Sequence, residues 1–113
     1  MEEIKMEDGY SNMKKDILEE IGTELNTAII IVTSDSGVSN NKFPKRLMNK
    51  PVKLKEVIKY FNYSFDAGYG GQQCHSFYIF KKKEVLFIWE YDGSTSISSV
   101  PRNPSSFSPN GHA

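Results

Sequence analysis

The stretch SFYIFKKKEVLFIWEYDGSTSISSV (residues 76–100) decides the fold of this chain. It divides into three segments rich in β-branched and aromatic residues, 76–80, 84–91 and 94–100, which are the residue types that favour strands. A lysine turn separates the first two segments. The pair Asp92-Gly93 separates the last two, and Asp-Gly is typical of a hairpin because both residues tolerate a positive φ. The stretch therefore predicts a meander of three antiparallel strands.

The middle strand of this meander is apolar on both of its faces for most of its length. Such a strand is expected in the interior of a sheet, so we place it at the centre and predict that Trp89 is largely buried. Its two alternating sets are Val85, Phe87, Trp89 and Tyr91 on one face, and Leu86, Ile88 and Glu90 on the other.

Upstream, one further strand and two helices are predicted. TAIIIVT (27–33) is a short β-branched run and predicts an interior strand. Apolar residues recur at helical spacing over 12–21, with Ser11 or Asn12 as N-cap and Gly22 just past the end. A second helix is predicted to start near Pro51, with its apolar face formed by Leu54, Val57, Ile58 and Phe61.

These elements follow one another as α-β-α-β-β-β. The simplest assembly is an α+β two-layer sandwich, in which two helices cover one face of a four-stranded, mostly antiparallel mixed sheet. The 113 residues suit one domain over 1–100, followed by an extended Pro/Ser-rich tail over 101–113. The other face of the sheet would carry aromatic side chains. It would be covered by the tail, be covered by a second subunit in a homodimer, or serve as a binding surface.

Charge is unevenly distributed along the chain although the net charge is zero. Residues 1–24 contain eight acids and three bases, whereas residues 42–59 contain seven bases and one acid. The two segments either neutralise each other or leave a basic patch for a nucleic acid, a nucleotide or an acidic protein. The candidate patch residues are Lys45, Arg46, Lys53, Lys55 and Lys59.

The segment DAGYGGQQCH (66–75) is the candidate binding loop. Three glycines in four positions favour a connection whose backbone is approached closely by something else. Stacking and hydrogen-bonding side chains surround these glycines, and Trp89 lies on a neighbouring strand. The predicted ligand-binding residues are Asp66, Tyr69, Gly70, Gly71, Gln73, Cys74, His75 and Trp89.

Several classes of site find no support in the sequence. The chain has one cysteine and two histidines, too few for a zinc site of the usual kind, and no metal or other cofactor is expected. The glycines follow a predicted helix and precede a strand, which is the wrong context for a phosphate-binding loop. The longest apolar runs have five residues, so we expect no membrane span and a cytoplasmic location.

The sequence leaves three functional hypotheses. The first is a small intracellular, non-catalytic binding protein that recognises a protein partner or a small ligand through 66–75 and the adjacent aromatic strands. The second is a nucleic-acid or nucleotide binder that uses 42–59. The third is a small hydrolase or transferase that depends on Cys74 or His75, although adjacent residues of an extended chain point in opposite directions.

Overall fold

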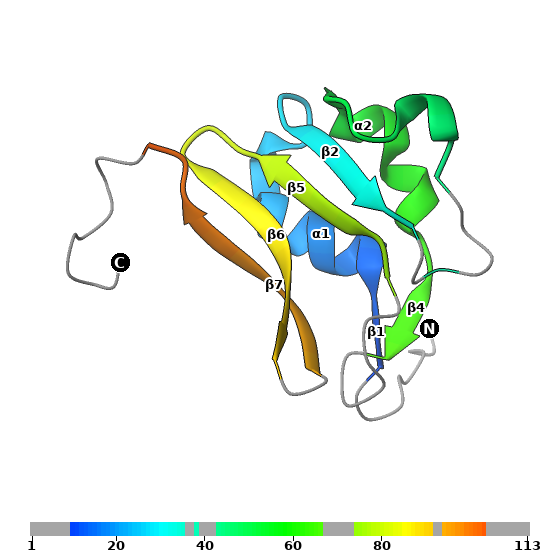
Figure 1. Cartoon of the computed structure of the whole chain (residues 1–113). Coiled ribbons are helices and arrows are strands. Elements are labelled where there is room, and N and C mark those ends of the chain that lie inside the picture. Colours follow the sequence, from blue (N-terminus) through cyan, green and yellow to red (C-terminus); the bar gives the residue numbers. More distant parts are fainter. Residues whose placement is uncertain (1–9, 36–37, 39–42, 67–73, 92–93, 104–113) are drawn as a thin grey trace, which may run out of the picture.

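The computed structural model describes residues 10–35, 38, 43–66, 74–91 and 94–103, and Figure 1 shows its architecture. These residues form an α+β fold with two α-helices, three 3₁₀ helices and seven strands. The helices are α1 (Met13–Ile21), η1 (Gly22–Glu24), η2 (Lys45–Leu47), α2 (Leu54–Val57) and η3 (Ile58–Phe61). The strands are β1 (Tyr10–Asn12), β2 (Ile29–Ser34), β3 (Val52–Lys53), β4 (Ser64–Asp66), β5 (Ser76–Phe80), β6 (Glu84–Tyr91) and β7 (Ser94–Pro101).

The main sheet has five strands in the order β3-β2-β5-β6-β7, and every neighbouring pair is antiparallel. The predicted meander is confirmed, because β5, β6 and β7 pair in sequence. The predicted count of four strands is wrong, because the short strand β3 adds an edge beside β2. The sheet is also not mixed: β2 and β5 are antiparallel, so no crossover connection joins them. A separate pair, β1 and β4, makes a second small antiparallel sheet.

Helix α1 begins and ends at the residues that the sequence indicates. Asn12 is the N-cap, and its side-chain oxygen accepts a hydrogen bond from the Lys15 amide at 3.0 Å. Gly22 follows the last turn with φ +59°, a conformation in which a Cβ is disfavoured, and its amide donates to the Leu18 carbonyl. A short polar cap and a glycine stop therefore define this helix.

The predicted second helix is shorter and less regular than its apolar spacing suggests. Val52 and Lys53 form β3 instead, and only four residues of α2 are α-helical before the chain tightens into η3. The Leu54 amide donates to the Ala28 carbonyl at 3.0 Å, which ties the start of α2 to the chain just before β2. Pairing with the β2 edge thus replaces the first helical turn. The apolar spacing still predicts the buried face of this segment correctly, since Leu54, Val57 and Phe61 are buried.

Both α-helices pack on the same face of the main sheet, as predicted. The inward side chains of the strands meet those of α1, α2 and η3 in one core, and α1 lies behind the sheet in the view of Figure 1. The strands contribute Ile30, Val32, Phe77, Ile79 and Leu86 to this core, and the helices contribute Met13, Ile17, Ile21, Leu54, Val57 and Phe61.

Candidate binding surface

The face of the main sheet that points away from α1 is lined by apolar and aromatic side chains. Along β2 the burial alternates, with Ile30 and Val32 buried, Ile29 and Ile31 partly buried, and Thr33 exposed. Side chains alternate between the two faces along a strand. The residues of β5 and β6 whose side chains point away from the core therefore lie on this outer face. We call this surface the open face; its apolar members on β2, β5 and β6 are Ile29, Ile31, Tyr78, Phe80, Val85, Phe87 and Trp89.

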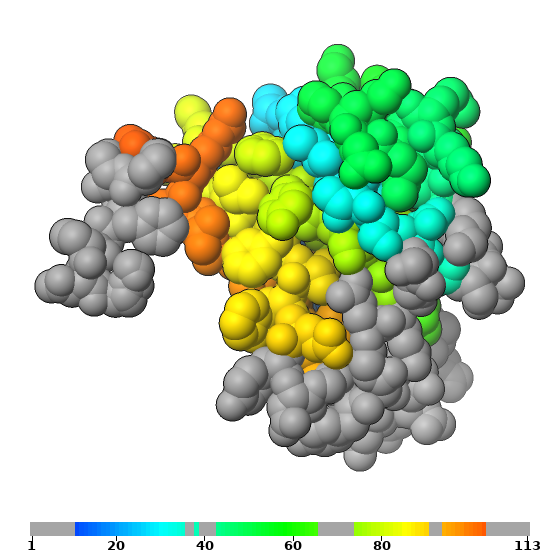
Figure 2. All heavy atoms as spheres, in the orientation of Figure 1, coloured from blue at the N-terminus to red at the C-terminus, as the bar shows by residue number. Residues whose placement is uncertain are grey.

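Strand register brings the members of the open face together in rows. Ile31 lies opposite Tyr78, which lies opposite Phe87; Ile29, Phe80 and Val85 form the next row. Figure 2 looks onto this face, where side chains of β2, β5 and β6 lie side by side, and no described helix crosses it in Figure 1. A contiguous apolar surface of this kind is typical of an interaction site.

Trp89 is a member of this surface and is not a core residue. It is 49% exposed and Tyr78 is 47% exposed, so the prediction that Trp89 is largely buried is wrong. The strand β6 is apolar on both faces, but only the face bearing Leu86 packs against the helices. The strand is also next to the edge strand and not at the centre of the sheet, where β5 lies.

The predicted loop 66–75 is only partly within the described residues. Tyr69, Gly70, Gly71 and Gln73 lie outside them. Asp66 ends β4, where its backbone pairs with Tyr10, so the segment leaves a strand at its start.

The last two residues of this segment, Cys74 and His75, are completely buried. Cys74 belongs to the hydrophobic core and is not exposed at the open face.

His75 is held by Tyr63, a residue that the sequence analysis did not single out. The Tyr63 hydroxyl accepts a hydrogen bond from the His75 amide at 2.9 Å and lies 2.8 Å from His75 Nδ1. Both contacts are satisfied together when the hydroxyl donates its proton to Nδ1 and the imidazole carries its own proton on Nε2. Phe61 packs edge-on against the imidazole, with ring centroids 4.8 Å apart. No spacing in the sequence links 63 to 75, because the contact forms only in the fold.

Cys74 lies in surroundings that disfavour a thiolate. Burial, followed by the negative charge of Glu90, raises the pKa of the thiol from its ordinary value of 9.0 to about 12. Reactive cysteines have lowered pKa values and partial exposure. The surroundings of Cys74 therefore give no support to a Cys74-dependent hydrolase or transferase.

We expect Cys74 to resist iodoacetamide in the native protein and to react in urea. Because the pKa of the thiol is raised in the folded state, ionisation favours the unfolded chain, and stability should fall as pH rises above about 9. Labelling rates measured by mass spectrometry, with and without urea, test this. Fast native labelling that titrates near pH ~8.5 would contradict the burial and restore the nucleophile hypothesis.

The five residues of the predicted basic patch are all exposed, on η2, β3, α2 and η3. Within the described ranges, no ion pair joins them to the acids of α1 and η1. The Lys59 ammonium lies 5.5 Å from the centre of the Tyr60 ring, a weak cation–π contact. The patch is accessible, and it lies on elements separate from the strands of the open face that carry Tyr78 and Trp89.

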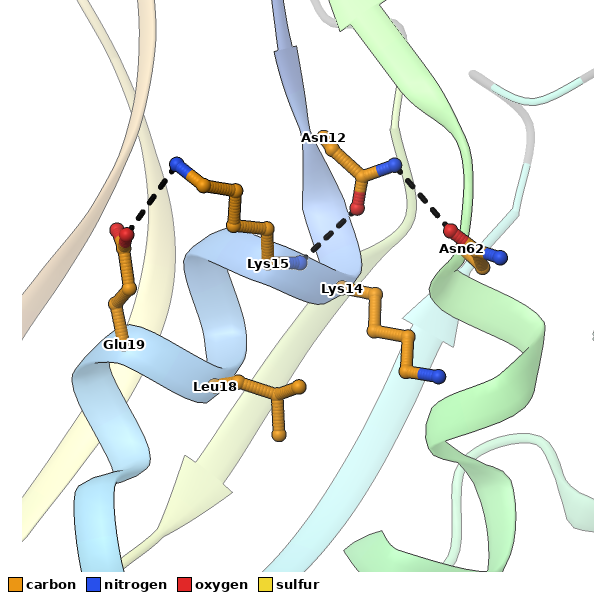
Figure 3. A pocket seen from close by; sticks show the side chains of 6 residues that line it. All are labelled: Asn12, Lys14, Lys15, Leu18, Glu19 and Asn62. Atoms are coloured by element: carbon orange, nitrogen blue, oxygen red, sulfur yellow. Dashed lines mark hydrogen bonds and ion pairs between the residues drawn. The ribbon is translucent and has the colours of Figure 1, made fainter. Parts of the chain in front are cut away.

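A hollow of about 500 Å³ lies beside the start of α1 (Figure 3). Its amide groups contact each other: Asn12 donates to the Asn62 side-chain oxygen at 3.3 Å while capping the helix. Lys15 and Glu19 form an ion pair at 3.3 Å that is largely in solvent. The polar side chains of this hollow therefore cap the helix or form an exposed ion pair.

Comparison with known proteins adds no family to this geometry: no family model, no curated protein and no solved structure matches the chain. None of the described helices is both long and apolar enough to cross a membrane. Over the same described residues, no cluster of three or more His, Cys, Asp or Glu side chains is arranged to hold a metal ion. The candidate function therefore rests on the open face and its surroundings.

Proposed function

We propose that this chain is a non-catalytic binding protein that docks a protein partner on the open face. The observation that carries the proposal is the exposure of Tyr78 and Trp89, each about half accessible, on neighbouring strands of a sheet whose other face packs against the helices in the core. Large aromatic side chains that are half exposed lose little conformational entropy when a partner docks. Docking also removes much of their apolar area from water.

The shape and composition of the open face favour a protein over a small ligand as the occupant of its aromatic end. Tyr, Trp and Phe are enriched in protein interfaces and dominate their binding energies. The hollow beside Tyr78 and Phe87 has only about 280 Å³, which is small for a site that encloses a ligand. An exposed aromatic surface instead suits a partner that covers it.

Two features distinguish this proposal from its alternatives. The basic patch offers charge, but Lys45, Arg46, Lys55 and Lys59 lie outside the main sheet and Lys53 lies on its edge strand β3. The patch therefore does not place its charge beside Tyr78 and Trp89 on β5 and β6, where bases could stack. Cys74 and His75 are both buried, and burial raises the pKa of the Cys74 thiol, so their surroundings do not favour the hydrolase or transferase hypothesis. A second copy of the chain remains one possible protein partner.

Native mass spectrometry of the protein purified gently from its own cells tests the proposal. We expect the wild-type chain to carry a bound protein, which the measured mass identifies as another chain or a second copy. The double variant Trp89→Ala/Tyr78→Ala should weaken this complex by at least about 30-fold, the effect of losing about 2 kcal/mol at a binding hot spot. Lys55→Ala, an exposed change on α2, should leave it intact.

Three outcomes would overturn the proposal. The first is a bare wild-type monomer at the concentrations of the cell. The second is an equally stable complex in the double variant, with urea unfolding showing that this variant is folded. The third is a bound small molecule in place of a protein, which would reject the class of partner.

A further inference from the structure

A groove of about 690 Å³ lies at the end of the open face where β5 turns into β6, away from Trp89. Its volume is in the range of small-molecule sites. Ile29, Ile31 and Phe80 make its apolar floor, and we call it the apolar groove. The other residues that line it are Thr23, Glu24, Thr27, Pro51, Lys81, Lys82 and Arg102.

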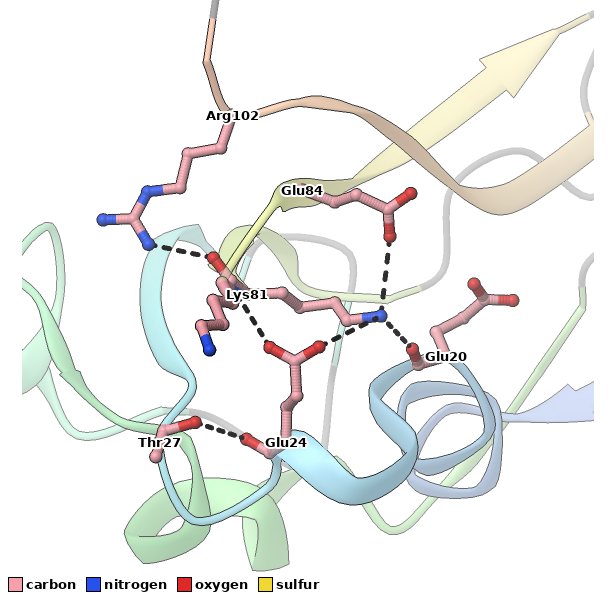
Figure 4. Close-up of polar contacts among 7 residues, drawn as sticks. Glu20, Glu24, Thr27, Lys81, Glu84 and Arg102 are labelled. Atoms are coloured by element: carbon pink, nitrogen blue, oxygen red, sulfur yellow. Dashed lines mark hydrogen bonds and ion pairs between the residues drawn. The ribbon is translucent and has the colours of Figure 1, made fainter. Parts of the chain in front are cut away.

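Arg102 is fixed at the side of this groove by three contacts. Its guanidinium carbon lies 5.8 Å from the centre of the Phe80 ring. Its Nη1 donates to the Lys81 carbonyl at 2.9 Å, as Figure 4 shows. Its main-chain amide donates to the Lys83 carbonyl at 2.8 Å. A guanidinium held in this way keeps further N–H donors and loses little conformational entropy when it binds an anion.

The acidic residue of the groove is already engaged by its neighbours. Glu24 Oε1 accepts a hydrogen bond from the Lys82 amide at 2.7 Å, and Oε2 lies 3.9 Å from Lys81 Nζ. Lys81 Nζ also contacts Glu84 at 3.5 Å and donates to the Glu20 carbonyl at 2.9 Å, as Figure 4 shows. Lys81 is therefore paired with both Glu24 and Glu84 at the base of the turn.

The side-chain charges of two cations of the apolar groove have no acidic partner in the part of the chain that the structure describes. Among the described residues, neither Lys82 nor Arg102 forms an ion pair with a carboxylate. Both also line a second hollow, of about 580 Å³, together with Lys83 and Asn103. The groove thus joins an apolar floor to a positively charged rim.

We propose that the apolar groove binds a small amphipathic carboxylate, with its alkyl or aryl body on Ile29, Ile31 and Phe80. Its carboxylate is paired with Arg102 and Lys82, because a guanidinium matches a carboxylate in two parallel hydrogen bonds. A monoanion fits better than a dianionic phosphate, since the Glu24 carboxylate lines the same groove. The groove adjoins the protein-docking end of the open face, since Ile31 lies opposite Tyr78, but its binding is measured on the isolated chain and does not depend on a docked partner.

Titration calorimetry of the full chain with decanoate, below its micelle concentration, tests this site. We expect one decanoate per chain, with methyl NMR shifts concentrated at Ile29 and Ile31. Decanol, which has the same tail without the charge, should bind at least about tenfold more weakly, equivalent to about 1.4 kcal/mol. Decyl phosphate should bind no more tightly than decanoate.

Three substitutions, each of which removes one positive charge, distinguish binding in the apolar groove from general electrostatic attraction. Arg102→Gln and Lys82→Gln should each weaken decanoate binding at least about 12-fold, the lower limit for losing one hydrogen bond to a charged group. Lys83→Gln removes the same charge next to the groove but outside its lining, and should leave the affinity within about twofold. Urea unfolding confirms that each variant is folded.

The proposal is overturned by any of four results: no decanoate binding to the wild type, equal binding of decanol, an equal loss in Lys83→Gln, or tighter binding of decyl phosphate.

Discussion

Phe61→Ala should lower the free energy of unfolding by about 3–5 kcal/mol, the usual cost of deleting a large aromatic side chain from a core. Phe61 is fully buried at the end of η3 and has ring contacts with Phe43, His75 and Phe77 at centroid distances of 6.1, 4.8 and 5.7 Å. Its removal leaves a cavity where the helical layer meets β5, bounded by rings too rigid to collapse into it. Urea unfolding followed by circular dichroism measures the change.

Tyr78→Ala is the matched control, because it removes an aromatic ring of similar size from the open face. Tyr78 is about half exposed, so its loss should cost less than about 1.5 kcal/mol. Equal costs for the two variants would contradict the assignment of the two sheet faces. A small cost at Phe61 alone would show that η3 does not pack as described.

Tyr63→Phe should cost about 2–4 kcal/mol although it removes a single oxygen atom. That oxygen contacts both the amide and Nδ1 of the buried His75. Each buried polar group that loses a hydrogen-bond partner costs about 1–3 kcal/mol, far more than the net gain from an average bond. Burial also raises the pKa of the Tyr63 phenol above its ordinary value of 10.0, so the hydroxyl stays a donor through the neutral range.

Tyr60→Phe gives the comparison for this prediction. Tyr60 lies three residues earlier and is partly buried, and its hydroxyl makes no hydrogen bond with other described residues. We expect a change within about 0.5 kcal/mol, as for a surface substitution. If both hydroxyls proved equally dispensable in urea unfolding, the Tyr63–His75 contact would carry no stability.

Local signals in the sequence predicted those parts of the fold that depend on a few neighbouring residues. Asn12 and Gly22 bracket α1 through a side-chain cap and a positive φ. Val52 and Lys53 were misassigned to a helix because their pairing with β2 is a long-range contact, which outweighs helical spacing over two residues.

The binding surface was harder to predict than the fold. Trp89 was identified as a site residue but expected in the core, since an apolar strand does not reveal which of its faces the helices cover. Tyr63 lies 12 residues before His75, and the two meet only in the fold. Arg102 reaches Phe80 only because β7 returns beside β6, so no short motif connects the residues of the apolar groove.

The proposal that the open face docks a protein is tested most directly by acrylamide quenching of Trp89, the single tryptophan of the chain. In the isolated chain at low concentration, the indole should be readily quenched, as its 49% exposure predicts. In the complex purified from cells it should be strongly protected, and dissociation of the complex should restore quenching. Equal quenching in the isolated chain and in the complex would show that the partner binds elsewhere, and would contradict the central claim.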